Sequence, residues 1–241
     1  MIDVADLGTI LGVWAHPDDD IYLSAGLMAA AVAREQRVVD VTATRGEGGS
    51  MDEERWPPES MGDVRTNELL RSLDVLGVKE HRFLDGPVDI DMETGLDQAG
   101  ADQVHRIMGE VDPDTVLTFG PEGMTGHVAH QDVSRWASEA FDAVAKPGAQ
   151  LFHAVFPKSH ADEWLEKLAP FDIFRPGTPN VVADEEIDLD HDVEGPFLDQ
   201  KIASIKEHAS QIEALYEVFG DEGFRRFMAK EAFVLAATKG A

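Results

Sequence analysis

The sequence predicts an α/β protein with a Rossmann-like, three-layer α/β/α fold and a mostly parallel sheet. Between residues 9 and 156, short apolar runs rich in β-branched residues alternate with longer runs that suit helices. Such alternation is typical of right-handed βαβ units, whose helices cover both faces of the sheet. Hydrophobic residues make up 43% of the 241, which is ample for a packed core, and we expect a single domain over residues 1–241.

The predicted strands are short and rich in β-branched or aromatic residues. They lie at residues 9–13, 38–44, 81–84, 115–119 and 151–156, with edge candidates at 181–182 and 187–189 and a last buried strand at 232–236. The predicted helices are longer, and most carry apolar residues three or four apart. They cover residues 27–35, 63–76, 101–111, 127–144, 161–168, 196–219 and 224–228. Asp63 and Pro196 suit helix starts, and Gly77 suits a helix end.

Composition excludes several classes of partner and site. The formal net charge is −27, from 47 acidic and 20 basic residues, and so acidic a surface repels nucleic acid and anionic membranes. The chain has no cysteine, so a metal site must use His, Asp and Glu. No signal-peptide pattern is present, and no apolar run approaches the ~18–20 residues of a membrane span, so we expect a cytoplasmic location. Oligomeric state is left open.

The histidines and carboxylates that could form a reactive site follow the first and fourth predicted strands. After the first strand come His16, Pro17 and the three carboxylates Asp18, Asp19 and Asp20. Adjacent carboxylates repel one another unless a proton or a cation lies between them. A bound metal ion is the simplest way to stabilise such a cluster. After the fourth strand, a glycine-rich loop leads to a second motif with histidines at positions 127 and 130. In a Rossmann-like sheet these strands are neighbours and ligands bind at their carboxyl ends, so the motifs should converge.

Together the two motifs provide the donors that a catalytic zinc ion prefers. His16, Asp19 and His130 would supply two nitrogens and one oxygen and leave a position for water or substrate. Such an ion acidifies water, a neighbouring carboxylate can take the proton, and the ion and an imidazole can stabilise an oxyanion. This chemistry favours amide or ester hydrolysis.

The order of the motifs resembles that of the LmbE-like, or PIG-L, family of zinc-dependent N-deacetylases. Residues 15–20 are similar to its Ala-His-Pro-Asp-Asp-Glu signature, and residues 126–130 to its second metal motif. Residues 44–49 resemble its Thr-x-Gly-Glu-x-Gly loop, and residues 65–69 its Arg-x-x-Glu-Leu helix. A late Ala-x-x-x-x-His-x-Ser-Gln element is similar to residues 203–211.

The resemblance implies a role for each matching residue. His16, Asp19 and His130 would bind Zn²⁺, or another divalent transition metal such as Fe²⁺. Asp18 would be the general base, and His127 would stabilise the oxyanion or protonate the leaving amine.

The resemblance also implies a substrate, which Glu47, Arg65 and Asp85 would bind. The expected reaction removes an acyl group, normally acetyl, from the amide nitrogen of an N-acetylated amino sugar, its conjugate or a similar small molecule.

Two departures from the family pattern keep alternatives open. Asp20 replaces the usual Glu, and Val128 and Ala129 replace a Pro-Asp pair between the two histidines, so the role and protonation of His127 stay undecided. The alternatives are a divalent-metal phosphohydrolase, a nucleotide-binding module and a catalytically inert family member. Two histidines favour zinc-like metals over magnesium, and the first turn lacks the Gly-x-Gly-x-x-Gly fingerprint of dinucleotide sites.

Overall fold

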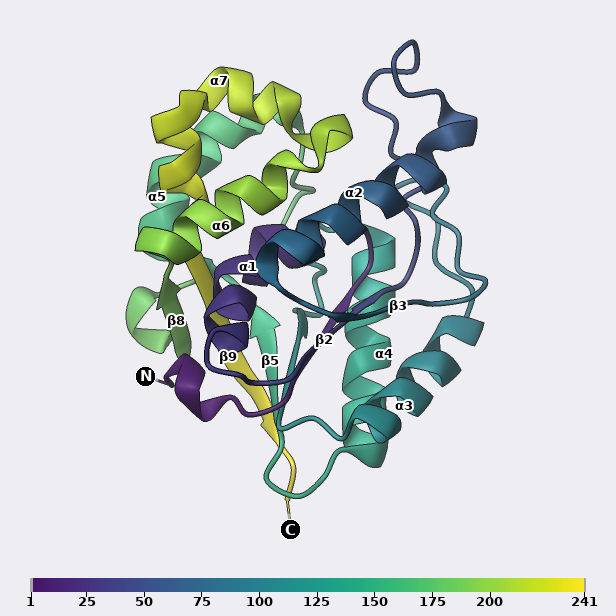
Figure 1. The fold of residues 1–241 in the computed structure, drawn as a ribbon, viewed down its shortest axis with the longest axis vertical. Coiled ribbons are helices and arrows are strands. Elements are labelled where there is room, and N and C mark those ends of the chain that lie inside the picture. The colour runs from purple at the N-terminus through teal and green to yellow at the C-terminus, as the bar shows by residue number, and fades with distance from the viewer. Residues whose placement is uncertain (1, 241) are drawn as a thin grey trace.

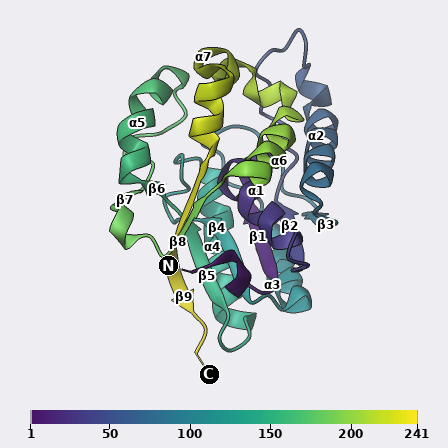
Figure 2. The same cartoon turned by 60° about the vertical axis from the view of Figure 1, so that its left-hand side comes forward.

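The computed structural model describes residues 2–240, and in that range a seven-stranded sheet is flanked by helices on both faces (Figures 1 and 2). The order of the strands is β3-β2-β1-β4-β5-β9-β8, and all neighbours from β3 to β5 are parallel. β9 runs antiparallel to both β5 and β8. The predicted α/β class and mostly parallel sheet are therefore confirmed.

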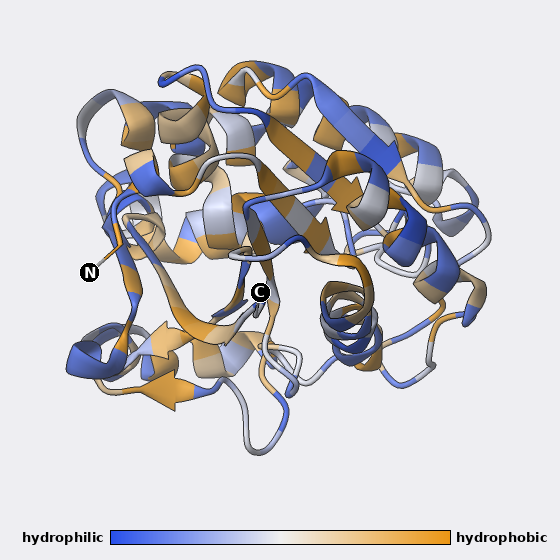
Figure 3. Ribbon diagram, turned by 90° about the horizontal axis from the view of Figure 1, so that it is seen from below, coloured by the Kyte–Doolittle hydropathy of each residue, from blue (hydrophilic) through white to orange (hydrophobic). Residues whose placement is uncertain are grey.

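The first five strands of the sheet alternate with helices. The strands are β1 (Ile10–Trp14), β2 (Val38–Thr42), β3 (Glu80–Phe83), β4 (Thr115–Phe119) and β5 (Gln150–Ala154). The helices are α1 (Asp19–Val32), α2 (Met61–Leu76), α3 (Ala99–Val111) and α4 (Val128–Val144). All residues of β1, β2 and β4 are buried, as expected of strands covered on both faces. Figure 3 shows the apolar strands in the interior and polar residues on the outer helices.

The later part of the chain adds a second group of elements. They are β6 (Phe156–Pro157), α5 (Lys158–Leu168), β7 (Val181–Val182), β8 (Leu189–Asp192), α6 (Gly195–Lys206), α7 (Ala209–Met228) and β9 (Lys230–Thr238). Short 3₁₀ turns lie at Val4–Asp6, Pro58–Ser60, Ala169–Phe171 and Asp184–Glu186. β6 and β7 form a separate parallel pair, whereas β8 is the edge strand of the main sheet.

The topology places the two histidine motifs side by side. β1 pairs directly with β4, from Ile10 opposite Thr115 to Gly12 opposite Leu117. Because both strands run in the same direction, the segments that follow them leave the same edge of the sheet. This edge is the switch point of the strand order, as the sequence predicts.

Two predicted helices differ from the structure by more than a few residues. α1 begins at Asp19, not at residue 27, since its first turn accommodates Asp19 and Asp20 at the positive end of the helix dipole. The single helix predicted over 196–219 was wrong, because the chain breaks at His208 (φ −87°, ψ 51°) into α6 and α7. The buried Glu68 carboxylate accepts the backbone N–H and the hydroxyl of Ser210, so it caps α7 at this break (2.9 and 2.6 Å).

A fully buried ion pair joins three elements of the fold. Lys201 on α6 contacts Glu231 on β9 at 2.6 Å. The Glu231 carboxylate also accepts the backbone N–H groups of Gly26 and Leu27 in α1 (2.7 and 2.8 Å). The Lys201 ammonium donates to the carbonyl of Tyr22, one turn earlier in α1 (3.0 Å). Each charge therefore has several partners, which buried charges require.

The substitution Lys201→Met should lower the free energy of unfolding by about 3–5 kcal/mol, because it leaves Glu231 buried without a counter-charge. Urea denaturation at fixed metal concentration measures this loss. Lys206→Met is the matched control on the same helix, since Lys206 is exposed and pairs with Asp221 at 3.5 Å; it should change stability by less than about 1 kcal/mol. Equal effects of the two substitutions would contradict a structural role for the buried pair.

Among residues 2–240, none of the helices has both the length and the apolarity that a membrane crossing would need.

Candidate metal centre

The first group of site residues lies in the tight turn between β1 and α1. The backbone N–H of His16 donates to Asp19 Oδ2 at 2.7 Å, which fixes the two side chains relative to each other. Asp18 is the residue before the helix and has a φ of 127°. A non-glycine residue at such a φ is strained, and strain of this kind concentrates at functional sites.

The second group lies at the start of α4, where hydrogen bonds select the tautomer of each histidine. His130 Nδ1 lies 2.9 Å from the carbonyl of Gly123, so Nδ1 carries the proton and Nε2 has a free lone pair. His127 caps the helix, and its Nδ1 accepts the backbone N–H of Ala129 at 3.2 Å. In neutral His127 the proton is therefore on Nε2. His130 therefore has a nitrogen lone pair available for a metal ion, and His127 has an N–H available to donate a hydrogen bond.

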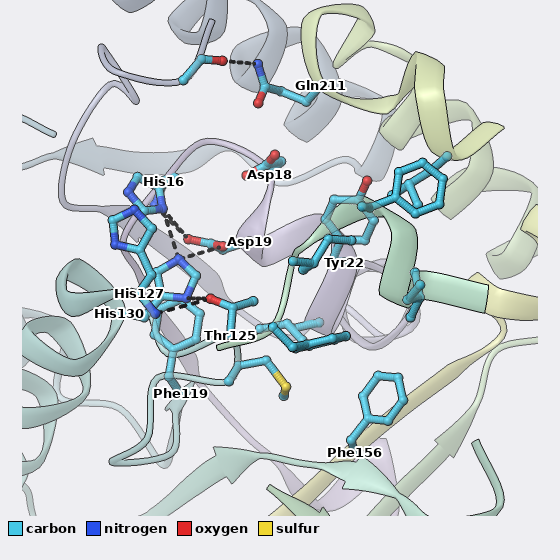
Figure 4. A pocket seen from close by; sticks show the side chains of 18 of the residues that line it. His16, Asp18, Asp19, Tyr22, Phe119, Thr125, His127, His130, Phe156 and Gln211 are labelled. Carbon is cyan, nitrogen blue, oxygen red and sulfur yellow. Dashed lines mark hydrogen bonds and ion pairs between the residues drawn. The ribbon is translucent and has the colours of Figure 1, made fainter. Parts of the chain in front are cut away.

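His16, Asp19 and His130 converge as the sequence predicts. His16 Nδ1 lies 3.0 Å from His130 Nε2 and 3.5 Å from Asp19 Oδ2, and His130 Nε2 lies 3.4 Å from Asp19 Oδ1. Ligands about 2.0 Å from a tetrahedral zinc ion are themselves about 3.3 Å apart. The donor types and their spacing therefore fit one divalent ion (Figure 4).

A second, overlapping set of donors includes a residue that sequence reasoning missed. Asp89 Oδ1 lies 3.4 Å from His16 Nε2 and 3.7 Å from His127 Nε2. Within the part of the chain that the structure describes, Asp89 Oδ1 and His16 Nε2 are buried without a hydrogen-bond partner. The acidic, turn-rich segment around Asp89 has no periodicity that would reveal which of its carboxylates turns inward.

The electrostatics of the cluster favour positive charge beside Asp19 and Asp89, while His127 and His130 stay neutral. Burial lowers the pKa of His130 and of His127 to about 4 in each case. Burial opposes the protonation of His16 too, but Asp19 and Asp89 outweigh it and raise the pKa of His16 to about 9. Burial would raise the pKa of Asp19, yet His130 and His16 hold it well below its usual range. The two carboxylates thus attract positive charge to the space around His16.

Asp18 and Arg65 form a buried pair beside this cluster. The Arg65 Nη2 atom donates to Asp18 Oδ1 at 3.1 Å and to the carbonyl of Pro17 at 2.8 Å. Burial raises the pKa of Asp18 to about 7, although the Arg65 guanidinium opposes the shift. A Cβ atom on Gly46 or Gly49 would collide with the guanidinium, which explains the glycine-rich loop after β2.

A cavity of about 580 Å³ opens above the cluster. Its lining includes every predicted metal ligand as well as Asp18, Arg65 and His127 (Figure 4). Glu47 is placed just behind the lining, where its carboxylate accepts the backbone N–H of Asp89 at 3.2 Å. Asp85 is not among the lining residues, and its side chain is exposed.

The substitution Arg65→Met should lower kcat/KM by about 10²-fold, since Arg65 holds Asp18 in place and small displacements of a reacting group have effects of this size. Arg71→Met is the matched control on the same helix, because Arg71 is exposed and pairs with Glu207. Steady-state kinetics on both variants at equal metal content measures the difference. Equal activities of the two variants would show that Arg65 does not contribute to the reaction.

Two comparisons with known proteins rest on the amino-acid sequence. A family model described as PIG-L, GlcNAc-PI de-N-acetylase, matches residues 11–141. A 1D-myo-inositol 2-acetamido-2-deoxy-alpha-D-glucopyranoside deacetylase from Streptomyces avermitilis is 30% identical over 264 residues, which cover 88% of this chain and 85% of the relative.

Two solved structures share the fold. The N,N'-diacetylchitobiose deacetylase of Pyrococcus horikoshii has a TM-score of 0.66 and 20% identity over 96% of this chain and 84% of that one. GalB, the 4-carboxy-2-hydroxymuconate hydratase of Pseudomonas putida, also has a TM-score of 0.66, with 17% identity over 98% of both chains. Because these two proteins catalyse different reactions on one architecture, the structural likeness supports the fold alone.

Proposed function

The chain belongs to the PIG-L family and is a metal-dependent N-deacetylase of that family; we propose that its metal is zinc and that its substrate is an N-acetylated amino sugar or a similar small molecule. The observation that carries the proposal is the convergence of His16, Asp19 and His130 beside Asp18 on one wall of a cavity. The Streptomyces relative is named as a deacetylase of an acetamido sugar joined to inositol, which supports a sugar-like substrate.

In the proposed site, His16, Asp19 and His130 would hold the zinc ion. His16 and His130 are buried and the Asp19 side chain is only 12% exposed, which limits competing water. The Nδ1–H···O=C bond of His130 keeps its Nε2 atom directed at the ion. When bound, the ion would supply Lewis acidity at the amide carbonyl.

Asp18 would act as the general base. Its carboxylate would take a proton from the attacking water and then deliver it to the nitrogen of the leaving amine as the C–N bond breaks. A base works best when its pKa lies near the operating pH, and burial raises the pKa of Asp18 to about 7. The products would be acetate and a free amine.

His127 would stabilise the negative charge that develops on the carbonyl oxygen. Its Nδ1 atom already accepts the N–H of Ala129, so its Nε2–H is the atom free to donate. This arrangement favours a neutral hydrogen-bond donor over a general acid, and it does not need the acidic neighbour that Ala129 replaces. Arg65 and Asp89 would contact the polar part of the substrate, and Glu47 would act through Asp89.

A metal-defined assay tests the proposal. The protein is stripped with chelator, reconstituted with one equivalent of zinc and given a panel of N-acetylated amino sugars, including acetylglucosaminyl inositol. Release of acetate that depends on added zinc is the expected result. Phosphate release from aryl phosphates, without acetate release from any member of the panel, would overturn the proposal in favour of a phosphohydrolase.

A further inference from the structure

The cavity has a second, apolar wall opposite the metal cluster. Figure 4 shows the imidazoles of His16, His127 and His130 on one side of the pocket, and Tyr22 and Phe156 on the other. The apolar lining comes from β6, α5, the turn after α5, and α7, and it includes Phe156, Leu168, Phe171, Phe174, Leu215 and Phe227. These segments all lie beyond residue 141, where the match to the family model ends.

Aromatic contacts hold this wall in a fixed shape. The ring of Phe156 lies 5.9 Å from that of Phe174 and 5.0 Å from the imidazole of His160. His160 in turn stacks on Phe227 at 5.6 Å, and buried Trp164 supports Phe227 from behind at 5.5 Å. The wall is therefore preformed, and an apolar group that enters it meets ordered rings rather than mobile chains.

This part of the cavity offers little to a charged ligand. Its charged side chains already have partners of opposite sign. The pairs are Lys230 with Asp190 and Asp192, Glu231 with Lys201, and Asp172 with Arg175. Burial lowers the pKa of His160 to about 4, so this imidazole is neutral at pH 7. Against the aromatic rings, a polar sugar would lose hydration without gaining hydrogen bonds from them.

From this division of the cavity we propose that the substrate carries an apolar group, an alkyl chain or aromatic ring, which binds against the wall of Phe156, Phe174 and Phe227 while its amide lies at the metal cluster. This inference rests on the proposed function, since it concerns the substrate of the same site. The volume of about 580 Å³ falls in the range of about 300–1,000 Å³ that holds drug-sized ligands, so it accommodates more than an acetylated monosaccharide. The metal cluster and the apolar wall line the same cavity, so one molecule can contact both. We therefore assign the apolar wall to the substrate and not to a separate ligand.

Two substrate series test the proposal and distinguish the two places where the apolar group can be attached. One series varies the glycoside of N-acetylglucosamine from methyl to propyl and hexyl. The other keeps the methyl glycoside of glucosamine and lengthens the N-acyl group from acetyl to butanoyl and hexanoyl. Each methylene that leaves water should raise kcat/KM about fourfold, so at least a tenfold rise is expected along one series. A flat response in both series overturns the proposal.

Variants of the wall connect such a rise to these residues. In Phe174→Ser the ratio of kcat/KM between the hexyl and methyl ends of the responsive series should fall at least threefold, and Phe174→Leu should restore most of it. Val218→Ser is the matched control, because Val218 lies on α7 with 65% of its surface exposed and does not line the cavity; its ratio should equal that of the wild type. An unchanged ratio in Phe174→Ser would contradict the proposed position of the apolar group.

Calorimetric binding separates failure of this inference from failure of the proposed function. The zinc-loaded Asp18→Asn variant is titrated with the members of both series. Affinity that rises with chain length, without acetate or acid release by the wild type, would support the apolar site and refute the deacetylase assignment. Turnover by the wild type, with affinities that do not depend on chain length, would support the proposed function and refute the apolar site.

Discussion

Replacing His130 with alanine is expected to abolish stoichiometric metal binding and to lower kcat/KM by at least about 10³-fold. His130 Nε2 is one of three donors that lie within 4.8 Å of one another, and two remaining donors hold a zinc ion poorly. Loss of the ion removes several kcal/mol of transition-state stabilisation, which corresponds to a factor of this size. Elemental analysis after dialysis and steady-state kinetics measure the two effects.

A matched histidine elsewhere provides the control for this substitution. His105 on α3 is exposed and takes part in neither candidate metal group. His105→Ala should retain one zinc ion per chain and wild-type activity. Full zinc content in His130→Ala would show that His130 is not a ligand.

The substitution Asp18→Asn should lower kcat by about 10²–10⁴-fold while the zinc content stays at one ion per chain. The amide has the size of the carboxyl group but cannot accept a proton from water, and Asp18 contributes no atom to either candidate metal group. The effect should therefore appear in kcat and leave metal binding intact, which separates a base from a ligand.

The exposed Asp63 on α2 allows a parallel change outside the cavity. Asp63→Asn should have the kcat of the wild type. This result would show that the loss of one surface carboxylate does not itself lower kcat. If Asp18→Asn retained more than about a tenth of the activity at neutral pH, another group would have to be the base.

The sheet and the convergence of the motifs could be predicted because they depend on local patterns and one topological rule. Buried parallel strands are rich in apolar and β-branched residues, and β1 (Ile-Leu-Gly-Val-Trp) and β4 (Thr-Val-Leu-Thr-Phe) have this composition. Once they are neighbours, the residues after Trp14 and after Phe119 must share an edge of the sheet. The meeting of His16 with His130, 114 positions apart, follows from that rule.

Features that depend on side chains from distant segments were not predictable in this way. The break between α6 and α7 depends on Glu68, which caps Ser210 from 142 positions away. The inward turn of Asp89 depends on the loop around Glu47, whose carboxylate accepts its N–H. The apolar wall arises from segments whose residues look like ordinary core residues until α5 and α7 are placed beside the metal cluster.

The proposed function requires that the turns after β1 and β4 bind a single divalent ion. Anomalous diffraction at the zinc absorption edge, from crystals of the zinc-loaded protein, locates this ion. We expect one peak about 2.0–2.2 Å from His16 Nδ1, a carboxylate oxygen of Asp19 and His130 Nε2. A peak held by His16, Asp89 and His127 instead, or no peak at this edge of the sheet, would contradict it.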